Sequence, residues 1–295
     1  ADDLTPVEWE ADPELEWCPP GHGDIYTALL ASGLLDALLD KGYRYAMTAN
    51  SDNLGAAPSA RIAGWFAASG APYAPEMCRR TPADVKGGHL AVRKSDGRII
   101  LRDTAQTPED QMHYFTDQFR HPFFHTNNLW FDLKVLRDTL ADRGGILGLP
   151  LIRNSKTVDP ADSSSTPVIQ LETAMGAAVE AFEGATAIEV PRSRFLPVKT
   201  TNDLLLVRSD VYEVDDDGLL QMVPDQACTV SLDPRFYKKI QDFEARFPNG
   251  VPSIKDAQSL TVDGDWTFGA DVVATGEAHV EAEGSPGRIA DGTRI

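Results

Sequence analysis

The segment WCPPGHGDIY, residues 17–26, constrains the fold most, because a proline pair and two glycines there lead directly into a helical pattern. The prolines stiffen the backbone, whereas Gly21 and Gly23 allow conformations and close approaches that a Cβ atom would forbid. Leucines at helical spacing follow to about residue 39 and predict one helix. A glycine loop that ends at a helix N-terminus suits an anionic ligand, and an ordinary strand-to-helix turn is the alternative.

The formal net charge of −18 over 295 residues argues against nucleic-acid binding, which needs a basic face. The three cysteines, Cys18, Cys78 and Cys228, include no close pair, which indicates a reducing compartment and neither a zinc site nor a disulfide framework. No apolar run approaches the ~18 residues of a membrane span, and no signal peptide is visible. We therefore expect a cytoplasmic protein that does not bind membranes.

The first two-thirds of the chain follow the pattern of an α/β fold. An apolar run over residues 43–49 predicts a buried strand, a polar loop with Asp52 follows, and a helix comes next. This β–loop–α order predicts a sheet of mostly parallel strands, with ligands at their carboxyl ends, where Asp52 lies. Further patterns predict a β-hairpin over residues 89–103, a strand over 123–128 that ends in an asparagine pair, and a helix over 168–183.

Four polar side chains here have the chemistry to handle a phosphorylated sugar. Asp52 offers a lone carboxylate of the kind that Mg²⁺ uses when water and phosphate supply its other ligands. Lys199, among prolines, and Lys86, in ADVKGG, can neutralise phosphate charge, and Asn127 can bind a sugar hydroxyl. We find no nucleophile-plus-base pattern, which favours transfer by positioning and charge neutralisation. Helix caps and exposed turns are the plain alternatives, so these residues predict a phosphate- and sugar-handling α/β enzyme without naming its substrate.

The pattern changes in residues 260–284, where short β-type pieces alternate with glycines. This spacing predicts a β-solenoid or a small β-layer. Only about two turns of a solenoid fit, so its end needs a neighbour, and contact with a second copy of the chain is one way to cover it.

The same polar residues lie in segments that resemble a known family, the eukaryotic-type UTP–glucose-1-phosphate uridylyltransferases, or UDP-glucose pyrophosphorylases. The segments occur in family order: WCPPGHGDIY, ANSDNLGA, ADVKGG, HTNNLW, VIQLETAMGAA and VPRSRFLPVKTTNDLLLV. The resemblance implies a glycosyltransferase-A-like (Rossmann-like) nucleotidyltransferase core in residues 1–205. It also implies a connecting segment with a helix in 206–255 and a small left-handed parallel β-helix in 256–295, through which a homo-oligomer is expected.

The resemblance further implies a reaction, in which glucose 1-phosphate attacks the α-phosphorus of UTP in line to give UDP-glucose and pyrophosphate. Gly21 would contact the uridine, and Asn50, Ser51 and Asp52 would hold the nucleotide, with Mg²⁺ on Asp52. Lys199 would bind the phosphates and stabilise the charge that builds during transfer.

For the sugar substrate, the resemblance assigns His22 to the phosphate and Glu76 and Asn127 to glucose hydroxyls, with Lys86 also in the substrate site. The chain has His125 where the family usually has asparagine.

The chain also shows no match to the family's N-terminal glycine-rich loop, which would cradle the triphosphate. We therefore expect the 295-residue chain alone to be impaired. A UDP-N-acetylhexosamine or broad UDP-sugar pyrophosphorylase and a non-catalytic assembly module are the alternatives.

Overall fold

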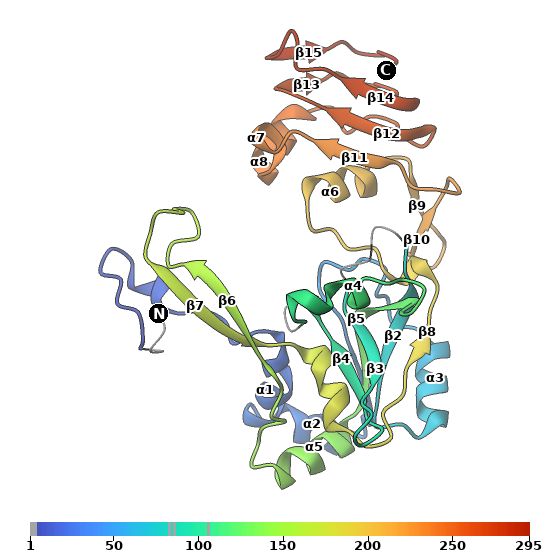
Figure 1. The fold of residues 1–295 in the computed structure, drawn as a ribbon. Helices are drawn as coiled ribbons and strands as arrows, with labels where there is room; N and C mark the ends of the chain where they lie inside the picture. The colour runs from blue at the N-terminus through green and yellow to red at the C-terminus, as the bar shows by residue number, and fades with distance from the viewer. Residues whose placement is uncertain (1–4, 82–83, 85–86, 105–106) are drawn as a thin grey trace. The chain divides into compact units, whose positions relative to one another are not determined.

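The computed structural model describes residues 5–81, 84, 87–104 and 107–295 (Figure 1). It divides into two compact units. Unit 1 comprises residues 1–49 and 58–191, and unit 2 comprises 50–57 and 192–295. The domain boundaries expected after residues 205 and 255 stay predictions.

The helical pattern after the GHG loop forms two α-helices instead of the single predicted one. A short 3₁₀ helix, η2 (His22–Asp24), precedes α1 (Ile25–Ala31) and α2 (Leu34–Asp40). Gly33 separates the two α-helices with a φ of +74°, a left-handed conformation that ends α1 and that residues with a Cβ rarely adopt.

The central sheet of unit 1 has the strand order β1-β5-β2-β8. Its strands are β1 (Tyr45–Thr48), β5 (Phe123–Asp132), β2 (Tyr73–Arg79) and β8 (Ile188–Glu189). β1 and β2 run in the same direction, as the β–loop–α order predicts, and β2 pairs in parallel with β8. However, β5 inserts between β1 and β2 and is antiparallel to both, so the expectation of mostly parallel strands holds for β1, β2 and β8 and fails for β5.

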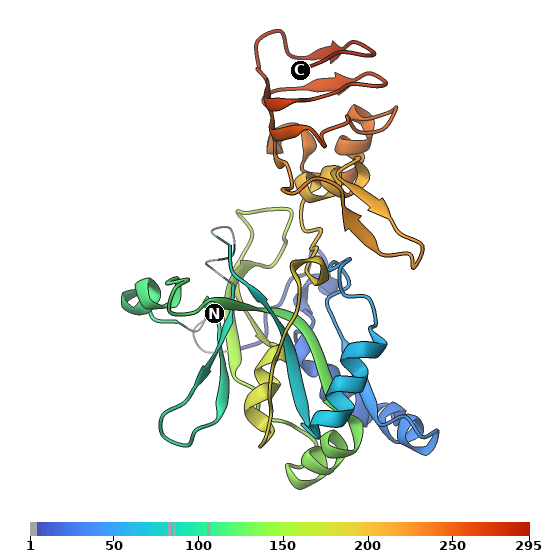
Figure 2. The same cartoon turned by 90° about the vertical axis from the view of Figure 1, so that its right-hand side faces the viewer.

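Helices cover both faces of this sheet (Figures 1 and 2). On one face, α3 (Ala60–Ser69) packs Phe66 against Trp130, with ring centroids 6.4 Å apart. The next strand residue, Phe131, points to the opposite face, where its ring lies 5.6 Å from that of Tyr26 in α1. The core on that face includes α2 and α5 (Leu133–Asp142).

Two hairpins flank the sheet. The predicted hairpin is confirmed as β3 (His89–Val92) and β4 (Ile99–Arg102), which pair antiparallel. The predicted helix over 168–183 is wrong, because its first half is strand β7 (Pro167–Thr173), paired with β6 (Leu151–Thr157) along its whole length. Only the second half is helical, as the 3₁₀ helix η6 (Met175–Ala181). Pairing with β6 outweighs the local helical pattern. Among the described residues, unit 1 also contains the short helices η1 (Pro13–Glu16), η5 (Glu109–Gln111) and α4 (Met112–Phe115).

Unit 2 begins with the loop of residues 50–57, which pairs with residues 196–198. The backbone N–H of Leu54 donates to the carbonyl oxygen of Leu196 at 3.0 Å, and that of Val198 donates to Asp52 at 2.8 Å. The unit then contains these helices and hairpin strands: η7 (Arg192–Arg194), α6 (Thr201–Arg208), β9 (Tyr212–Val214), β10 (Leu220–Met222), α7 (Pro234–Tyr237) and α8 (Ile240–Arg246).

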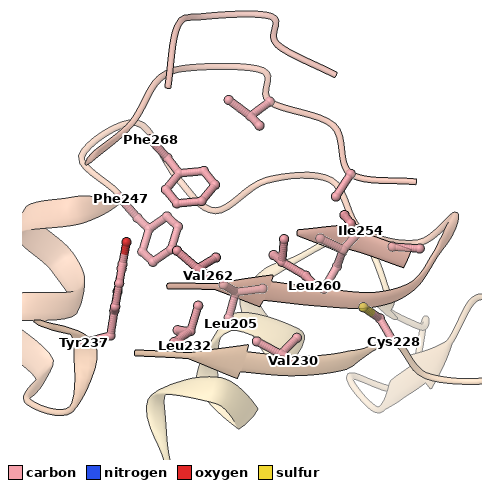
Figure 3. Close-up of a cluster of buried hydrophobic side chains, with 14 of the residues drawn as sticks. Leu205, Cys228, Val230, Leu232, Tyr237, Phe247, Ile254, Leu260, Val262 and Phe268 are labelled. Atoms are coloured by element: carbon pink, nitrogen blue, oxygen red, sulfur yellow. The ribbon is translucent and has the colours of Figure 1, made fainter. Parts of the chain in front are cut away.

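The rest of unit 2 consists of short parallel strands in stacked ladders (Figure 1). These strands are β11 (Thr229–Leu232), β12 (Ala257–Val262), β13 (Trp266–Phe268), β14 (Gly276–Val280) and β15 (Gly287–Ile289). One ladder is β11-β12-β14, a second is β13-β15, and parallel bridges join Ser253 to Val273 and Val273 to Arg294. Leu205, Leu260 and Phe268 lie in the hydrophobic cluster between these strands and the helices (Figure 3). The predicted short strands in 260–284 are confirmed.

Candidate functional site

The GHG loop packs against the end of β7. Gly21 has a φ of +88°, and a Cβ atom there would lie 2.6 Å from the carbonyl oxygen of Thr173. The same threonine donates its backbone N–H to the carbonyl oxygen of Pro20 at 3.0 Å. The lack of a side chain at residue 21 is therefore what lets the loop approach β7 and places His22 beside the start of η6.

His22 is held in one tautomer by the backbone of Met175, whose N–H donates to Nδ1 of the ring at 2.8 Å. In the neutral ring, Nε2 then carries the proton. Desolvation lowers the pKa of His22, against the opposite effect of Glu172 and Asp103. The exposed residue therefore offers a neutral N–H donor, which suits a phosphate or sugar oxygen.

Two buried tyrosines bind the carbonyl group of Met175, the residue whose N–H holds the His22 ring. The hydroxyls of Tyr26 and Tyr73 donate to the carbonyl oxygen of Met175 at 2.9 and 3.1 Å. Burial raises the pKa of both phenols, so both remain protonated donors at neutral pH. The main chain of Met175 thus connects the core of unit 1 to the His22 ring.

Asn127 lies in a bulge of β5 and not, as predicted, at the end of a strand. Its φ is +65°, and the register of β5 against β2 shifts between Pro75 and Met77. Asparagine tolerates this left-handed conformation better than most residues. Asn128 also lies inside β5.

The bulge is held by Glu76, which is fully buried in β2. The Glu76 carboxylate accepts hydrogen bonds from Nδ2 of Asn128 at 3.0 Å and from Nε1 of Trp130 at 2.9 Å. The hydroxyl of Thr126 donates to the main-chain carbonyl oxygen of Glu76 at 2.8 Å. Buried carboxylates require such donors, so Glu76 shapes the strand around Asn127. A direct contact between Glu76 and glucose stays a prediction.

Met175 and Gly176 connect the two halves of this polar cluster. A Cβ atom on Gly176 would lie 2.8 Å from Cε1 of His125 and 3.2 Å from Oδ1 of Asn127. Met175, which precedes Gly176, donates its backbone N–H to the His22 ring. His22, His125 and Asn127 therefore gather around the start of η6.

A second polar group is built within unit 2. The side chain of Asn53 joins the two chain segments of this unit, residues 50–57 and the start of 192–295. Its Nδ2 donates to the carbonyl oxygen of Arg194 at 3.1 Å, and its Oδ1 accepts from the N–H of Leu196 at 2.8 Å. Oδ1 of Asp52 is buried and has no hydrogen-bond partner in the described part of the chain. Lys199, exposed, directly follows Val198, which hydrogen-bonds to the backbone of Asp52.

The residues present fit a magnesium ion. Among the described residues, no group of three or more His, Cys, Asp and Glu side chains is arranged to hold a metal. A single carboxylate with an unpartnered oxygen, as in Asp52, matches a cation that takes most of its ligands from water and phosphate.

The predicted site residues thus fall into two sets, each built by its own unit. Unit 1 brings His22 and Asn127 to the same cluster, with Gly21 in the supporting loop and Glu76 beneath the bulge. Unit 2 contains Asn50, Ser51, Asp52 and Lys199. Lys86 lies outside the described residues.

Sequence reasoning missed the supporting residues Tyr26, Tyr73, Met175 and Gly176. Tyr26, Met175 and Gly176 lie inside quoted segments, yet nothing local marks Tyr73. A separate cavity of about 410 Å³, lined by residues that include Met77, Arg120 and Glu189, contains none of the predicted site residues. No helix among the described residues is long and apolar enough to cross a membrane.

The fold and the polar clusters define a mixed α/β protein with donors suited to phosphate and sugar oxygens. Solved structures share this fold. A mutant UDP-glucose pyrophosphorylase from Leishmania major, in complex with UDP-glucose, matches with a TM-score of 0.87 and 46% identity over 99% of this chain and 64% of that one. The UDP-glucose phosphorylase from Trypanosoma brucei matches with a TM-score of 0.88 and 45% identity over 100% of this chain and 64% of that one.

The chain belongs to the UTP–glucose-1-phosphate uridylyltransferase family, a family of nucleotidyltransferases whose model matches residues 1–274. The enzyme of that name from Solanum tuberosum is 41% identical over 284 residues, which cover 95% of this chain and 57% of the relative. That from Saccharomyces cerevisiae is 40% identical and covers 93% and 54%. The chain therefore spans somewhat more than half the length of these relatives, and the resemblance seen in the sequence is confirmed at the level of the family.

Proposed function

We propose that this chain serves the reaction of its family, the formation of UDP-glucose and pyrophosphate from UTP and glucose 1-phosphate. The observation that carries the proposal is the Nε2–H of His22, an exposed residue fixed next to the Asn127 bulge, since a phosphate donor beside a sugar-binding amide suits a hexose 1-phosphate. The buried, unpartnered Oδ1 of Asp52 supports a metal-nucleotide role for unit 2.

In this proposal the residues of unit 1 bind and orient the sugar phosphate. His22 donates to its phosphate, Asn127 and Glu76 select the glucose hydroxyls, and Lys86 also contacts this substrate. Gly21 contacts the uridine. Holding the attacking oxygen in line is the main contribution, because such a transfer needs positioning more than covalent help from the protein.

The residues of unit 2 bind the nucleotide and neutralise charge. Asn50, Ser51 and Asp52 hold UTP, and Asp52 would be the protein ligand of Mg²⁺, which supplies charge neutralisation at the phosphates when bound. Lys199 places its ammonium group against the phosphates, where charge builds as pyrophosphate leaves.

The finer architecture belongs to the same proposal. We assign residues 1–205 to a glycosyltransferase-A-like core, 206–255 to a connecting segment and 256–295 to a left-handed β-helix that joins copies of the chain. The parallel ladders of β11 to β15 support the β-helix. A cytoplasmic location fits the absence of any cysteine pair in the sequence.

A binding titration tests the function. Purified chain with Mg²⁺ is titrated with UDP-glucose and, in parallel, with UDP-N-acetylglucosamine. We expect saturable binding of UDP-glucose, weaker binding of the N-acetyl compound, and a roughly ten- to hundredfold loss of affinity in Lys199→Ala, because a charge-assisted contact to phosphate contributes about 1.5–3 kcal/mol. Lys238→Ala, an exposed lysine of the same unit, is the matched control. Binding of neither sugar nucleotide would contradict the proposal, and equal binding of both would favour a broad UDP-sugar enzyme.

A further inference from the structure

The His125 ring contains a buried nitrogen, Nε2, that has no partner in the part of the chain that the structure describes. Its other nitrogen, Nδ1, accepts the backbone N–H of Asn127 at 3.1 Å. A neutral imidazole whose Nδ1 is an acceptor carries its proton on Nε2. The unpartnered atom is therefore a hydrogen-bond donor. Native structures seldom leave a buried donor unsatisfied, because this costs about 1–3 kcal/mol.

The charge state of the ring is settled by its surroundings. Burial and the neighbouring His22 lower the pKa of His125 to about 4, so the ring is neutral near pH 7. His22 is arranged in the same way, with Nδ1 bound by a backbone N–H and Nε2–H left over. The two imidazoles influence each other electrostatically and form a pair of neutral donors in one cluster.

The position of the ring is equally constrained. Gly176 packs closely against the His125 ring and the amide of Asn127. A Cβ atom at residue 176 would lie 2.8 Å from Cε1 of His125 and 3.2 Å from Oδ1 of Asn127. The ring is thus held against the strand on one side and against η6 on the other. A donor that is this immobile can select a ligand by the position of one oxygen atom.

We propose that His125 is a specificity-determining ligand of the sugar phosphate, whose Nε2–H donates to an oxygen of the hexose 1-phosphate group. This inference rests on the proposed function, in which His22 binds the phosphate and Asn127 a hydroxyl of the same group. To the contacts of His22 and Asn127, the inference adds a third, which only a histidine at position 125 can make through an Nε2–H.

Two substitutions separate this role from a structural one. In His125→Asn, the amide oxygen can replace Nδ1 and accept the N–H of Asn127, but no atom reaches the position of Nε2. In His125→Gln, the longer amide can place an N–H near that position, while the acceptor beside the strand is lost. A ligand role predicts that the asparagine variant is the weaker binder, and a purely structural role predicts the reverse order.

The test is the dissociation constant of UDP-glucose for the full 295-residue chain with Mg²⁺. We expect His125→Asn to weaken binding at least about fivefold and His125→Gln to stay within about twofold of the wild type. UMP, which lacks both the hexose and its phosphate, should bind all three proteins equally. His113→Asn, an exposed histidine of the same unit, is the matched control.

A second measurement needs no variant. On addition of UDP-glucose, the Nε2–H signal of His125 should shift in ¹⁵N-correlated spectra, because the donor gains an acceptor. An asparagine variant with wild-type affinity, or an Nε2–H signal that UDP-glucose leaves unchanged, would overturn the inference while leaving the proposed function intact. A wild-type chain that binds no UDP-glucose would overturn both.

Discussion

The backbone N–H of Met175 donates to Nδ1 of His22 at 2.8 Å, and this contact leaves Nε2 as the nitrogen that carries the proton in the neutral ring. The same residue receives two tyrosine hydroxyls at its carbonyl oxygen. The exposed His22 is therefore oriented by buried residues. We expect substitutions of the two tyrosines to alter ligand binding through the backbone of Met175.

The double variant Tyr26→Phe/Tyr73→Phe tests this connection. It leaves the carbonyl oxygen of Met175 without its two hydroxyl donors, and a buried unsatisfied carbonyl costs about 1–3 kcal/mol. We expect this loss in the free energy of unfolding from urea titrations, together with weaker UDP-glucose binding. Each single variant keeps one donor and should lose less than half as much. A double variant with unchanged affinity would show that Met175 does not position His22.

The substitution Gly176→Ala tests the close approach at η6. The new methyl group would lie 2.8 Å from the His125 ring, so the ring or the helix must move, and UDP-glucose binding should weaken severalfold. Gly64→Ala is the control, since nothing lies within 4 Å of that position inside α3. Alanine there should stabilise the helix by about 0.5–1 kcal/mol. Equal responses of the two variants, measured by calorimetry and urea unfolding, would contradict the account.

Stability should fall when the pH drops from about 6.5 to 4.5. Burial lowers the pKa of His125 to about 4 and that of His89 to about 3, whereas both titrate near 6.5 in the unfolded chain. The unfolded state then binds more protons in this window, so acidification favours unfolding. Above about pH 7 both states are neutral at these rings and the effect vanishes. Urea unfolding at a series of pH values measures it, and His125→Asn should flatten the curve. A wild-type curve that is already flat would show that these rings do not remain neutral in the folded protein.

Asp233 should be the carboxylate that matters most for folding of unit 2. It caps α7 by accepting the N–H of Arg235 at 3.0 Å and also accepts the N–H of Gly264 at 3.0 Å. The hydrogen bond from the Arg235 side chain holds the pKa of this carboxyl far below its usual range. Asp233→Ala removes the cap and should cost about 1–3 kcal/mol in the free energy of unfolding. Asp216→Ala, at an exposed aspartate in the turn between β9 and β10, should change it by less than about 0.5 kcal/mol.

Local patterns predicted those elements whose partners are close in sequence. The β3–β4 hairpin and the glycine-spaced strands after residue 256 form as expected, because adjacent residues determine both. Strand β7 is an exception, because its partner β6 is close in sequence, and it was mistaken for a helix on account of the alanine-rich helical pattern that follows it in η6. The antiparallel insertion of β5 was missed because its partners, β1 and β2, lie in distant segments of the chain.

The site could be predicted only as a set of residues. The motifs identified His22, Asp52, Asn127 and Lys199, and the comparisons confirm the family. The support of His22 was out of reach, since Tyr73 and Met175 are 102 residues apart in sequence and no pattern in either segment indicates the contact. The unpartnered Nε2 of His125 likewise becomes visible only when the partners of its ring are known.

The central claim is that this chain handles UDP-glucose as a substrate. The most direct measurement is release of UTP from UDP-glucose in the presence of pyrophosphate and Mg²⁺, with UDP-N-acetylglucosamine assayed alongside. We predict release from UDP-glucose that depends on pyrophosphate and that Lys199→Ala lowers. Failure to release UTP and to bind UDP-glucose, or faster release from the N-acetyl compound, would contradict the claim.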